Sequence, residues 1–312
     1  MLRLVDRKGL KEAVLRLKKE KKALILCHNY QPTEIQEVSD HVGDSLELCM
    51  AASRSKGFER IVFCGVDFMA ESASVLNPDK DVYVPSRRAI CDMAAMLSPE
   101  QVRAARRQHP EAAVVLYINS LASAKAEADV ICTSANAVKV VSSLEQEEIL
   151  FGPDRNLALY VQSQLPEKVI IPLPDDGGCY VHKMITTQDI QRAKRIHPAA
   201  EILIHPECNP EVVDLADYVV STGGMVARAR ESDADEFIIG TEATMAETLA
   251  RLFPEKRFFP ALSEALCRGM RSIDMEKLKD SLENDKYEVK VDPSIARDVR
   301  RVTQRMLDLG RR

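Results

Sequence analysis

Three of the eight cysteines in this 312-residue chain lie at equal intervals, because Cys91, Cys179 and Cys267 are each 88 residues apart. Equal spacing of reactive residues indicates a triplicated unit in which each copy supplies one ligand to a shared centre. Thiolates bind zinc or the irons of an iron–sulfur cluster. A cubane cluster usually has four protein ligands, so three would leave one iron open. Such an iron can polarise carboxylates and activate hydroxyl leaving groups as a Lewis acid.

The surroundings of these cysteines favour ligands over core residues. A lone free cysteine is more often a buried apolar residue, but glycine or polar residues flank Cys179 and Cys267. No C-x-x-C pair is present, so the sequence does not predict a local zinc ribbon. Three other cysteines lie in apolar stretches and are expected to pack as core residues: Cys49, Cys64 and Cys132. Cys27 and Cys208 adjoin polar clusters, and the sequence leaves their roles open.

Polar side chains recur in the same register, each after an apolar strand or in the turn that follows. A histidine can donate to or accept from a carboxylate, a glutamate in a cleft can act as a general base, and hydroxyl groups at helix starts can bind carboxylate or phosphate oxygens. Each would be ordinary alone, and the shared register is what favours a site. The sets are His28, Tyr117 and His205; Tyr30, Asn119 and Glu207; and Ser45, Ser134 and Thr222.

Two further residues are candidates on weaker grounds. His182 lies three residues beyond Cys179, where it either orients a metal ligand or packs in the core, with equal weight. Met69 follows the end of a strand; a methionine there is more often a core residue, but its place keeps it a candidate.

Helices alternate with short, continuous apolar strands, which is typical of parallel sheets covered on both faces. In each third an amphipathic helix precedes the first strand, and a last strand ends at the proline before the spaced cysteine. We therefore predict an α/β fold of three homologous three-layer αβα domains with short parallel sheets, whose strand ends bind ligands. The expected helices start near 7, 98 and 186, and the expected strands cover 23–27, 113–118, 201–204, 61–64, 157–161 and 237–239.

The repeat period also sets the expected domain boundaries. Residues 1–97 form the first repeat with Cys91, residues 98–185 the second with Cys179, and residues 186–273 the third with Cys267. Residues 274–312 form a helical closure, in which 274–282 repeat the start of a unit and 295–309 form a last helix.

Composition is that of an ordinary globular protein, with 46% hydrophobic and 29% charged residues. A net charge of −5 and scattered basic residues argue against a nucleic-acid partner. No apolar run approaches the roughly 20 residues of a membrane span, and Met1–Lys22 lacks the apolar core of a signal peptide. We expect a cytoplasmic protein whose cysteines are thiols or metal ligands rather than disulfides.

An ordered set of motifs over nearly the whole chain resembles the quinolinate synthase family. Single motifs are modest signals, whereas their order is specific. The opening motif is HNYQP at 28–32, followed by VGDS at 42–45 and FCGVDFMAE at 63–71. The others are YINS at 117–120, CTSAN at 132–136, GCYVH at 178–182, HPEC at 205–208, STGGM at 221–225 and GTE at 240–242.

This resemblance implies three α/β domains about a pseudo-threefold axis and one 4Fe–4S cluster bound by Cys91, Cys179 and Cys267. It implies that iminoaspartate condenses with dihydroxyacetone phosphate to give quinolinate, phosphate and two waters, in the synthesis of NAD. An enzyme that makes iminoaspartate is the implied functional partner. The implied acid–base residues are Tyr30 and Glu207, with His28 and His205 orienting and shuttling protons. The implied substrate-binding residues are His28, Asp44, Ser45, Met69, Tyr117, Asn119, Ser134, His205, Glu207 and Thr222.

Three alternatives remain open from the residues themselves. An iron–sulfur hydro-lyase acting on a hydroxy-dicarboxylate needs the same open iron but releases no phosphate. An iron–sulfur redox protein normally has a fourth cysteine ligand and needs no polar pocket. A triplicated scaffold with structural cysteines is the third, and it would be colourless under anaerobic conditions.

Overall fold

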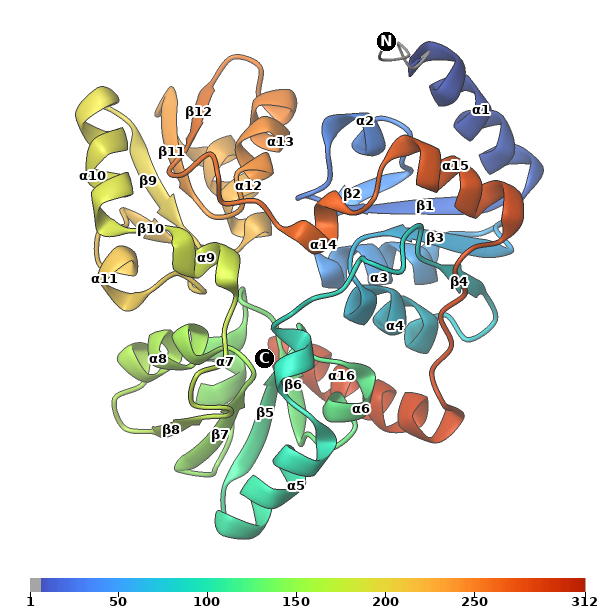
Figure 1. The fold of residues 1–312 in the computed structure, drawn as a ribbon. Coiled ribbons are helices and arrows are strands. Elements are labelled where there is room, and N and C mark those ends of the chain that lie inside the picture. The colour runs from blue at the N-terminus through green and yellow to red at the C-terminus, as the bar shows by residue number, and fades with distance from the viewer. Residues whose placement is uncertain (1–6, 312) are drawn as a thin grey trace. The chain divides into compact units, whose positions relative to one another are not determined.

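The computed structural model describes residues 7–311, and it contains three four-stranded parallel sheets with helices beside each of them (Figure 1). The predicted α/β fold of three αβα domains is therefore confirmed. The chain forms two compact units, one of Met1–Ile90 with Arg268–Val291 and one of Cys91–Cys267 with Asp292–Arg312. The boundaries of the three repeats and the pseudo-threefold axis stay predictions. Residues 1–6 of the predicted first repeat and residue 312 of the predicted closure lie outside the described residues.

The first unit holds one sheet, in which every residue of the central strand β1 (Ala23–His28) is buried. Such burial is expected of a strand covered on both faces. Helices α1, α2 and α15 cover one face, and α3 and α4 cover the other (Figure 1). The spatial order of strands is β2-β1-β3-β4. The other elements are β2 (His41–Gly43), β3 (Arg60–Cys64), β4 (Asp81–Tyr83), α1 (Arg7–Glu20), α2 (Thr33–Gln36), α3 (Ser45–Arg54), α4 (Asp67–Leu76), α14 (Arg268–Arg271) and α15 (Met275–Asn284).

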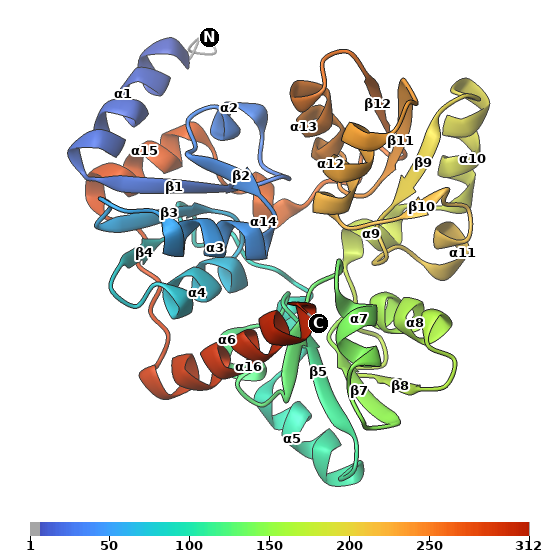
Figure 2. The same cartoon turned by 180° about the vertical axis from the view of Figure 1, so that it is seen from behind.

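The second unit holds the other two sheets, and the first of these has the order β6-β5-β7-β8. Helices α5 and α6 pack together on one face, and α7 and α8 on the other. The last helix, α16 (Pro293–Arg311), packs against α6, α7 and the edge strand β6, so it covers that edge (Figure 2). The elements are η1 (Ala94–Met96), α5 (Pro99–Gln108), β5 (Ala113–Tyr117), α6 (Ala122–Lys125), β6 (Val130–Cys132), α7 (Ala137–Ser142), β7 (Glu148–Gly152), α8 (Arg155–Gln164) and β8 (Val169–Pro172).

The last sheet has the equivalent order β10-β9-β11-β12. Helices α10 and α11 pack on one face, while α12 and α13 pack on the other (Figure 1). The elements are α9 (Tyr180–Met184), α10 (Thr187–Ile196), β9 (Glu201–Ile204), α11 (Pro210–Val213), β10 (Tyr218–Val219), α12 (Thr222–Glu231), β11 (Glu236–Gly240), α13 (Thr244–Leu252) and β12 (Arg257–Pro260).

The predicted strand over residues 157–161 is wrong, because these residues lie in helix α8. Asp154 caps this helix by accepting the backbone N–H of Leu157 at 2.7 Å, and the apolar run forms the buried face of the helix. A short apolar run does not distinguish a buried strand from a helix face. The strand that belongs at this place is β7, which directly precedes the cap. The sequence reading also missed a fourth strand in each sheet, namely β2, β6 and β10, which are only two or three residues long.

The helix starts expected near 98 and 186, and at 274, are confirmed. The side chains of Ser98, Thr186 and Asp274 each accept a backbone N–H three residues further on, so each starts the helix that follows. Helices α5 and α10 then lead into the first strands of the second and third sheets. Helix α15 has no following strand and instead packs on α1 and β3 of the first unit.

A repeated aspartate gives independent structural support for the triplication. Three aspartates directly precede the short edge strands of the sheets: Asp40, Asp129 and Asp217. Each carboxylate accepts a backbone N–H of the neighbouring strand at 2.8 Å. The donors are equivalent residues: Ile25, Val114 and Ile202. Each aspartate N–H also donates back to the carbonyl of that donor residue at 2.9 Å.

We predict that Asp129→Ala lowers stability by about 1–2 kcal/mol, because the N–H of buried Val114 loses its partner. Asp129→Asn keeps an acceptor oxygen and should lose less. Thermal unfolding midpoints of both variants test this, with the exposed Asp233→Ala as the control. A midpoint for Asp129→Ala equal to that of the control would contradict the prediction.

An ion pair on the third sheet gives a pH dependence of known sign. The pKa of Glu201 is lowered, first by hydrogen bonds from Arg228, against desolvation, and further by Ser232. A carboxyl whose pKa is lower in the folded state adds stability above its unfolded pKa, and this is lost as the pH falls through the folded value. We therefore expect Glu201→Gln to flatten the acid side of the stability–pH curve below about pH 5. An unchanged acid side would contradict it.

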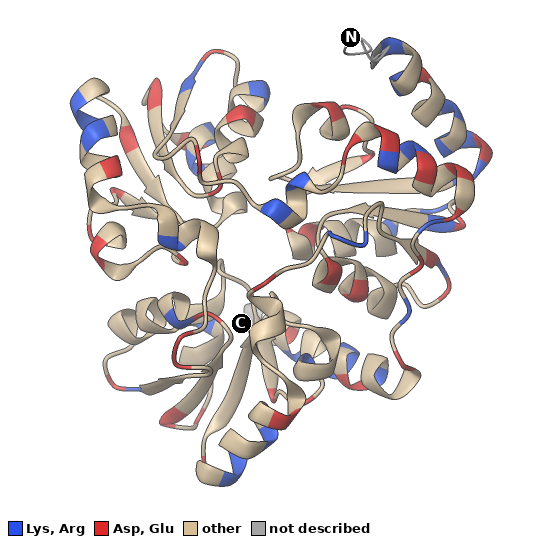
Figure 3. Cartoon of the chain, viewed as in Figure 1, with Lys and Arg blue, Asp and Glu red and all other residues tan. Residues whose placement is uncertain are grey.

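Charged residues of both signs are interspersed over the helices of each unit rather than gathered on one face (Figure 3). Among residues 7–311, none of the helices combines the length and the apolar character needed to cross a bilayer. All eight cysteines fall within this range, and none forms a disulfide.

Candidate functional site

The second unit brings two of the predicted strand-end residues into direct contact. Tyr117 is the last residue of β5, and Glu207 follows β9 by three residues. The Tyr117 hydroxyl donates a hydrogen bond to Oε1 of Glu207 at 2.7 Å. Both side chains are buried, at 4% and 3% exposure. The contact joins the carboxyl ends of two parallel sheets, where such sheets place their ligands.

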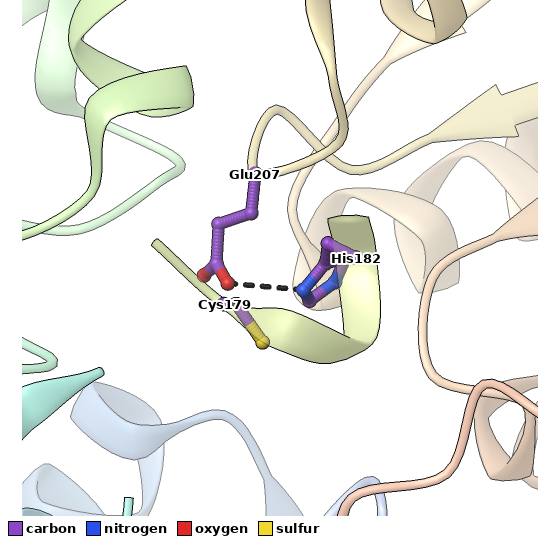
Figure 4. Close-up of side chains that lie close together, drawn as sticks. All are labelled: Cys179, His182 and Glu207. Atoms are coloured by element: carbon purple, nitrogen blue, oxygen red, sulfur yellow. Dashed lines mark ion pairs between the residues drawn. The ribbon is translucent and has the colours of Figure 1, made fainter. Parts of the chain in front are cut away.

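Two buried histidines lie beside the Glu207 carboxylate. Nδ1 of His182, on helix α9, lies 3.0 Å from Oε2 of Glu207 (Figure 4). The rings of His182 and His205 stack with centroids 4.8 Å apart. Nε2 of His182 shares a 2.7 Å hydrogen bond with the Thr241 hydroxyl. His182 is buried and contacts both Glu207 and Thr241, so either of its two sequence interpretations stays a prediction.

His205 and His28 make the same local contact in their respective repeats. Nδ1 of His205 accepts the backbone N–H of Glu207 at 3.4 Å, and Nδ1 of His28 accepts the N–H of Tyr30 at 3.2 Å. In each neutral ring the proton therefore lies on Nε2. Both rings thus present an N–H donor, which suits recognition of an anionic oxygen.

The electrostatics of this cluster favour a charged Glu207. Desolvation opposes ionisation, but electrostatic interaction with His182 and His205 and the hydrogen bond from Tyr117 outweigh it, so the pKa of Glu207 is lowered to about 2. Asp154 is fully buried nearby in the same unit, and burial together with the charge of Glu207 raises the pKa of Asp154 to about 7. The cluster therefore holds its negative charge mainly on Glu207.

A metal-binding donor set converges at this place. The ligand atoms of Cys179, His182 and Glu207 all lie within 4.8 Å of one another (Figure 4). Nδ1 of His182 is buried and, despite its short distance to Glu207, has no aligned hydrogen-bond partner. Thiolate, imidazole and carboxylate are ligands typical of zinc and iron. The donor chemistry therefore fits a metal centre beside Cys179.

The three evenly spaced cysteines are all partly exposed, whereas the other five are buried. They also lie near enough to interact electrostatically: desolvation, then Glu207, then Cys91 and Cys267 raise the pKa of the Cys179 thiol well above its usual value. A thiol in such surroundings ionises readily only beside a cation, which a bound metal centre provides. The three cysteines therefore fit a shared metal group.

The first unit holds five of the predicted site residues. His28 and Ser45 are buried at 5% and 7% exposure, and Met69 in helix α4 is buried at 3%. The rings of His28 and Tyr30 meet edge to face at 4.6 Å. Asp44 is the N-cap of α3 and forms a capping box with Glu47, and burial raises the pKa of Asp44. Ser45 is the first residue of that helix.

The remaining predicted residues lie in the second unit. Thr222, like Ser45, is the first residue of a helix that follows an edge strand. Ser134 instead lies in the turn between β6 and α7. Helix α7 begins only at Ala137, after Asn136. Asn119 lies two residues after Tyr117, the last residue of β5, and is half-buried. The roles of these three residues stay predictions.

Several contacting residues were not among the sequence candidates. Asn156 donates to the backbone carbonyl of Glu207 at 3.0 Å and to the Asn209 side chain at 3.1 Å, so it ties the Glu207 loop to α8. Thr241 bonds His182, as described above. Oδ2 of Asp154 accepts the backbone N–H of Cys179 at 3.2 Å. The GTE motif contains Thr241. Asp154 shares with Glu242 of that motif a spacing of 25 residues to a cysteine, whereas the sequence carries no signal for Asn156.

Comparison with known proteins agrees with the family resemblance seen in the sequence motifs. Residues 12–308 match the family described as "NadA: Quinolinate synthetase A protein". The chain is 57% identical over 298 residues to "Quinolinate synthase" of Methanothermobacter thermautotrophicus, with 96% of this chain and 97% of that protein covered. It is 51% identical over 300 residues to "Quinolinate synthase" of Pyrococcus horikoshii, with 96% and 99% covered. For the protein of the same name from Methanocaldococcus jannaschii the identity is 48% over 301 residues, with 95% and 97% covered.

A family model that matches most of the chain and relatives at 48–57% identity describe the same enzyme. The chain therefore belongs to the quinolinate synthetase A protein family of enzymes.

Proposed function

We propose that this protein is a quinolinate synthase that condenses iminoaspartate with dihydroxyacetone phosphate to quinolinate, with loss of phosphate and two waters, in the synthesis of NAD. The observation that carries this proposal is the buried cluster in which Glu207 meets Tyr117 and His182 beside Cys179. The names of the relatives support the reaction. An enzyme that produces iminoaspartate is the proposed functional partner.

We propose that Cys91, Cys179 and Cys267 hold a 4Fe–4S cluster as three ligands. Their thiols are partly exposed and interact in one unit, which fits this role. When bound, such a cluster supplies one open iron that acts as a Lewis acid on hydroxyl leaving groups. Unbridged thiols throughout residues 7–311 suit a reducing compartment, so we place the enzyme in the cytoplasm.

The chain's own residues then bind the substrates and move protons. Glu207, charged in its ground state, is the proposed proton acceptor, and the Tyr117 hydroxyl on Oε1 extends the hydrogen-bonded path from this carboxylate. His205 presents its Nε2 proton to an anionic oxygen, while His182 fixes the Glu207 carboxylate from the other side. Substrate binding is also assigned to Asn119, Ser134 and Thr222.

In the first unit, Tyr30 is the second proposed acid–base residue and His28 the residue that orients it. The edge-to-face contact of their rings and the Nδ1 acceptor of His28 support this pairing. Ser45 is proposed to bind carboxylate or phosphate oxygens at the start of α3, where Asp44 fixes the helix end. Met69 is proposed to lie near the substrates.

One observation favours a second candidate centre. The donor set of Cys179, His182 and Glu207 is complete enough to hold a single metal ion without the other two cysteines. Cys91→Ser and Cys267→Ser distinguish the two centres. If the three cysteines hold a cluster, either substitution should abolish it. If Cys179, His182 and Glu207 hold a single metal ion, neither substitution should remove that ion.

An anaerobic assay with both substrates tests the proposed reaction. Quinolinate and inorganic phosphate should appear in equal amounts in the reconstituted protein. A hydro-lyase would release no phosphate from dihydroxyacetone phosphate, and a redox protein would form no quinolinate. Either outcome would overturn the proposed function.

A further inference from the structure

Two fully buried carboxylates occupy the same place in two repeats. Asp154 and Glu242 are both 0% exposed. Each follows the end of a strand by two residues, within Gly-x-acid sequences that begin at Gly152 and Gly240. Each also precedes one of the spaced cysteines by 25 residues. The reaction described above gives neither residue a role.

Each carboxylate divides its oxygens between a helix start and a cysteine. Oδ1 of Asp154 accepts the N–H of Leu157 in α8 at 2.7 Å, and Oδ2 accepts the N–H of Cys179 at 3.2 Å. In the next repeat, Oε2 of Glu242 accepts the N–H of Thr244, the first residue of α13, at 2.8 Å. Oε1 of Glu242 accepts the N–H of Cys267 at 3.2 Å. The side chains differ by one methylene, and Oε1 of Glu242 also accepts the Thr244 hydroxyl at 3.3 Å, but each acid joins the start of a helix to the N–H of a spaced cysteine.

Capping the helices does not require this arrangement. The cap of α5 elsewhere in the same unit is Ser98, a half-buried neutral hydroxyl that accepts one helix N–H. Burying an ionised carboxylate is far more costly than burying a hydroxyl unless hydrogen bonds hold its charge. A repeated, fully buried acid whose second oxygen reaches a cysteine is therefore better explained by what it does for that cysteine.

We propose that Asp154 and Glu242 are positioning residues for Cys179 and Cys267: each fixes the peptide N–H of its cysteine and thereby sets where the thiol is presented to the shared metal group. This inference rests on the proposed function, because it takes the cysteines as cluster ligands. Groups that orient metal ligands commonly change metal affinity by 10–100-fold when removed.

The arrangement has a second consequence for the cluster. Backbone N–H groups that point at cluster sulfurs raise the reduction potential, and nearby negative charge lowers it. Here the N–H groups of Cys179 and Cys267 point at carboxylates instead. Removing either carboxylate frees the N–H of its cysteine to point at a cluster sulfur, so the potential should shift to a more positive value. A purely structural cap would not have this effect.

The test uses the full chain, reconstituted anaerobically with iron and sulfide. Asp154→Ala and Glu242→Ala remove the acceptors, and Ser98→Ala removes a cap whose side chain accepts the N–H of Gln101. We expect Asp154→Ala and Glu242→Ala to lose iron to a chelator at least roughly ten-fold faster than the wild type. We expect Ser98→Ala to lose iron at the wild-type rate. Thermal unfolding of the iron-free proteins should show similar losses of stability in all three.

The amide variants Asp154→Asn and Glu242→Gln keep the side-chain volume and one acceptor oxygen, so they serve even where an alanine variant does not fold. Because the amide can still hold the cysteine N–H, iron loss should lie between the wild-type and alanine rates. The clusters of Asp154→Ala and Glu242→Ala should have more positive reduction potentials than the wild type. Iron loss from Asp154→Ala and Glu242→Ala at the rate of Ser98→Ala, or an unchanged potential in both, would overturn the proposal. A wild type that binds no cluster would instead refute the proposed cofactor, so the two failures are distinguishable.

Discussion

Glu207→Gln is expected to lower the rate of quinolinate formation by about 10²–10⁴-fold while leaving the iron content of the protein unchanged. The amide keeps the shape of the side chain but cannot take up a proton. Tyr117 can still donate to its oxygen, so the site should stay assembled. The measurement is the anaerobic rate per bound cluster, with iron and sulfide counted in the same sample.

The control is Glu211→Gln, four residues further on, where the side chain is exposed. This variant should keep the wild-type rate. A Glu207→Gln enzyme that turns over at the control rate would remove Glu207 from the proposed chemistry. Loss of both iron and activity would show instead that Glu207 is a metal ligand, as the group with Cys179 and His182 allows.

Cys179→Ser is expected to abolish both the sulfide-bound iron and the formation of quinolinate. Cys179 belongs to the partly exposed set of three thiols and is the one that lies against Glu207 and His182. Serine is a poor ligand for iron in a cluster that depends on thiolates. The iron count after anaerobic reconstitution and the activity of the same sample measure the effect.

Cys208→Ser is the matched control, because Cys208 is 1% exposed and its thiol donates to the carbonyl of Gly240 rather than joining the donor set. A hydroxyl can make the same bond, so this variant should keep its iron. Equal iron contents in the two serine variants would contradict the assignment of Cys179.

Much of the fold follows from local sequence signals. Continuous apolar strands such as β1 and β9, and strong helix starts such as Ser98, are read directly from residue types. The short strands β2, β6 and β10 could not be predicted, because two or three residues show no hydrophobic periodicity. The run at 157–161 was misassigned because a strand buried on both faces and a buried helix face are both apolar.

Only the site residues that recur at equivalent positions of the repeat could be predicted from the sequence. His205, Glu207 and Tyr117 share one register, and the structure brings Tyr117 and Glu207 into contact. The contacts of Asp154 depend instead on how a strand end folds back toward a cysteine 25 residues later. Nothing in the local sequence encodes that approach, so it became visible only in the folded chain.

The most direct test of the account is to measure quinolinate formation against sulfide-bound iron in one protein preparation reconstituted to increasing extents under anaerobic conditions. The account predicts no quinolinate from the iron-free protein, and activity that rises in proportion to iron up to about four irons and four sulfides per chain. Full activity with a single metal ion and no sulfide would contradict it, and so would a fully loaded brown protein that forms no quinolinate.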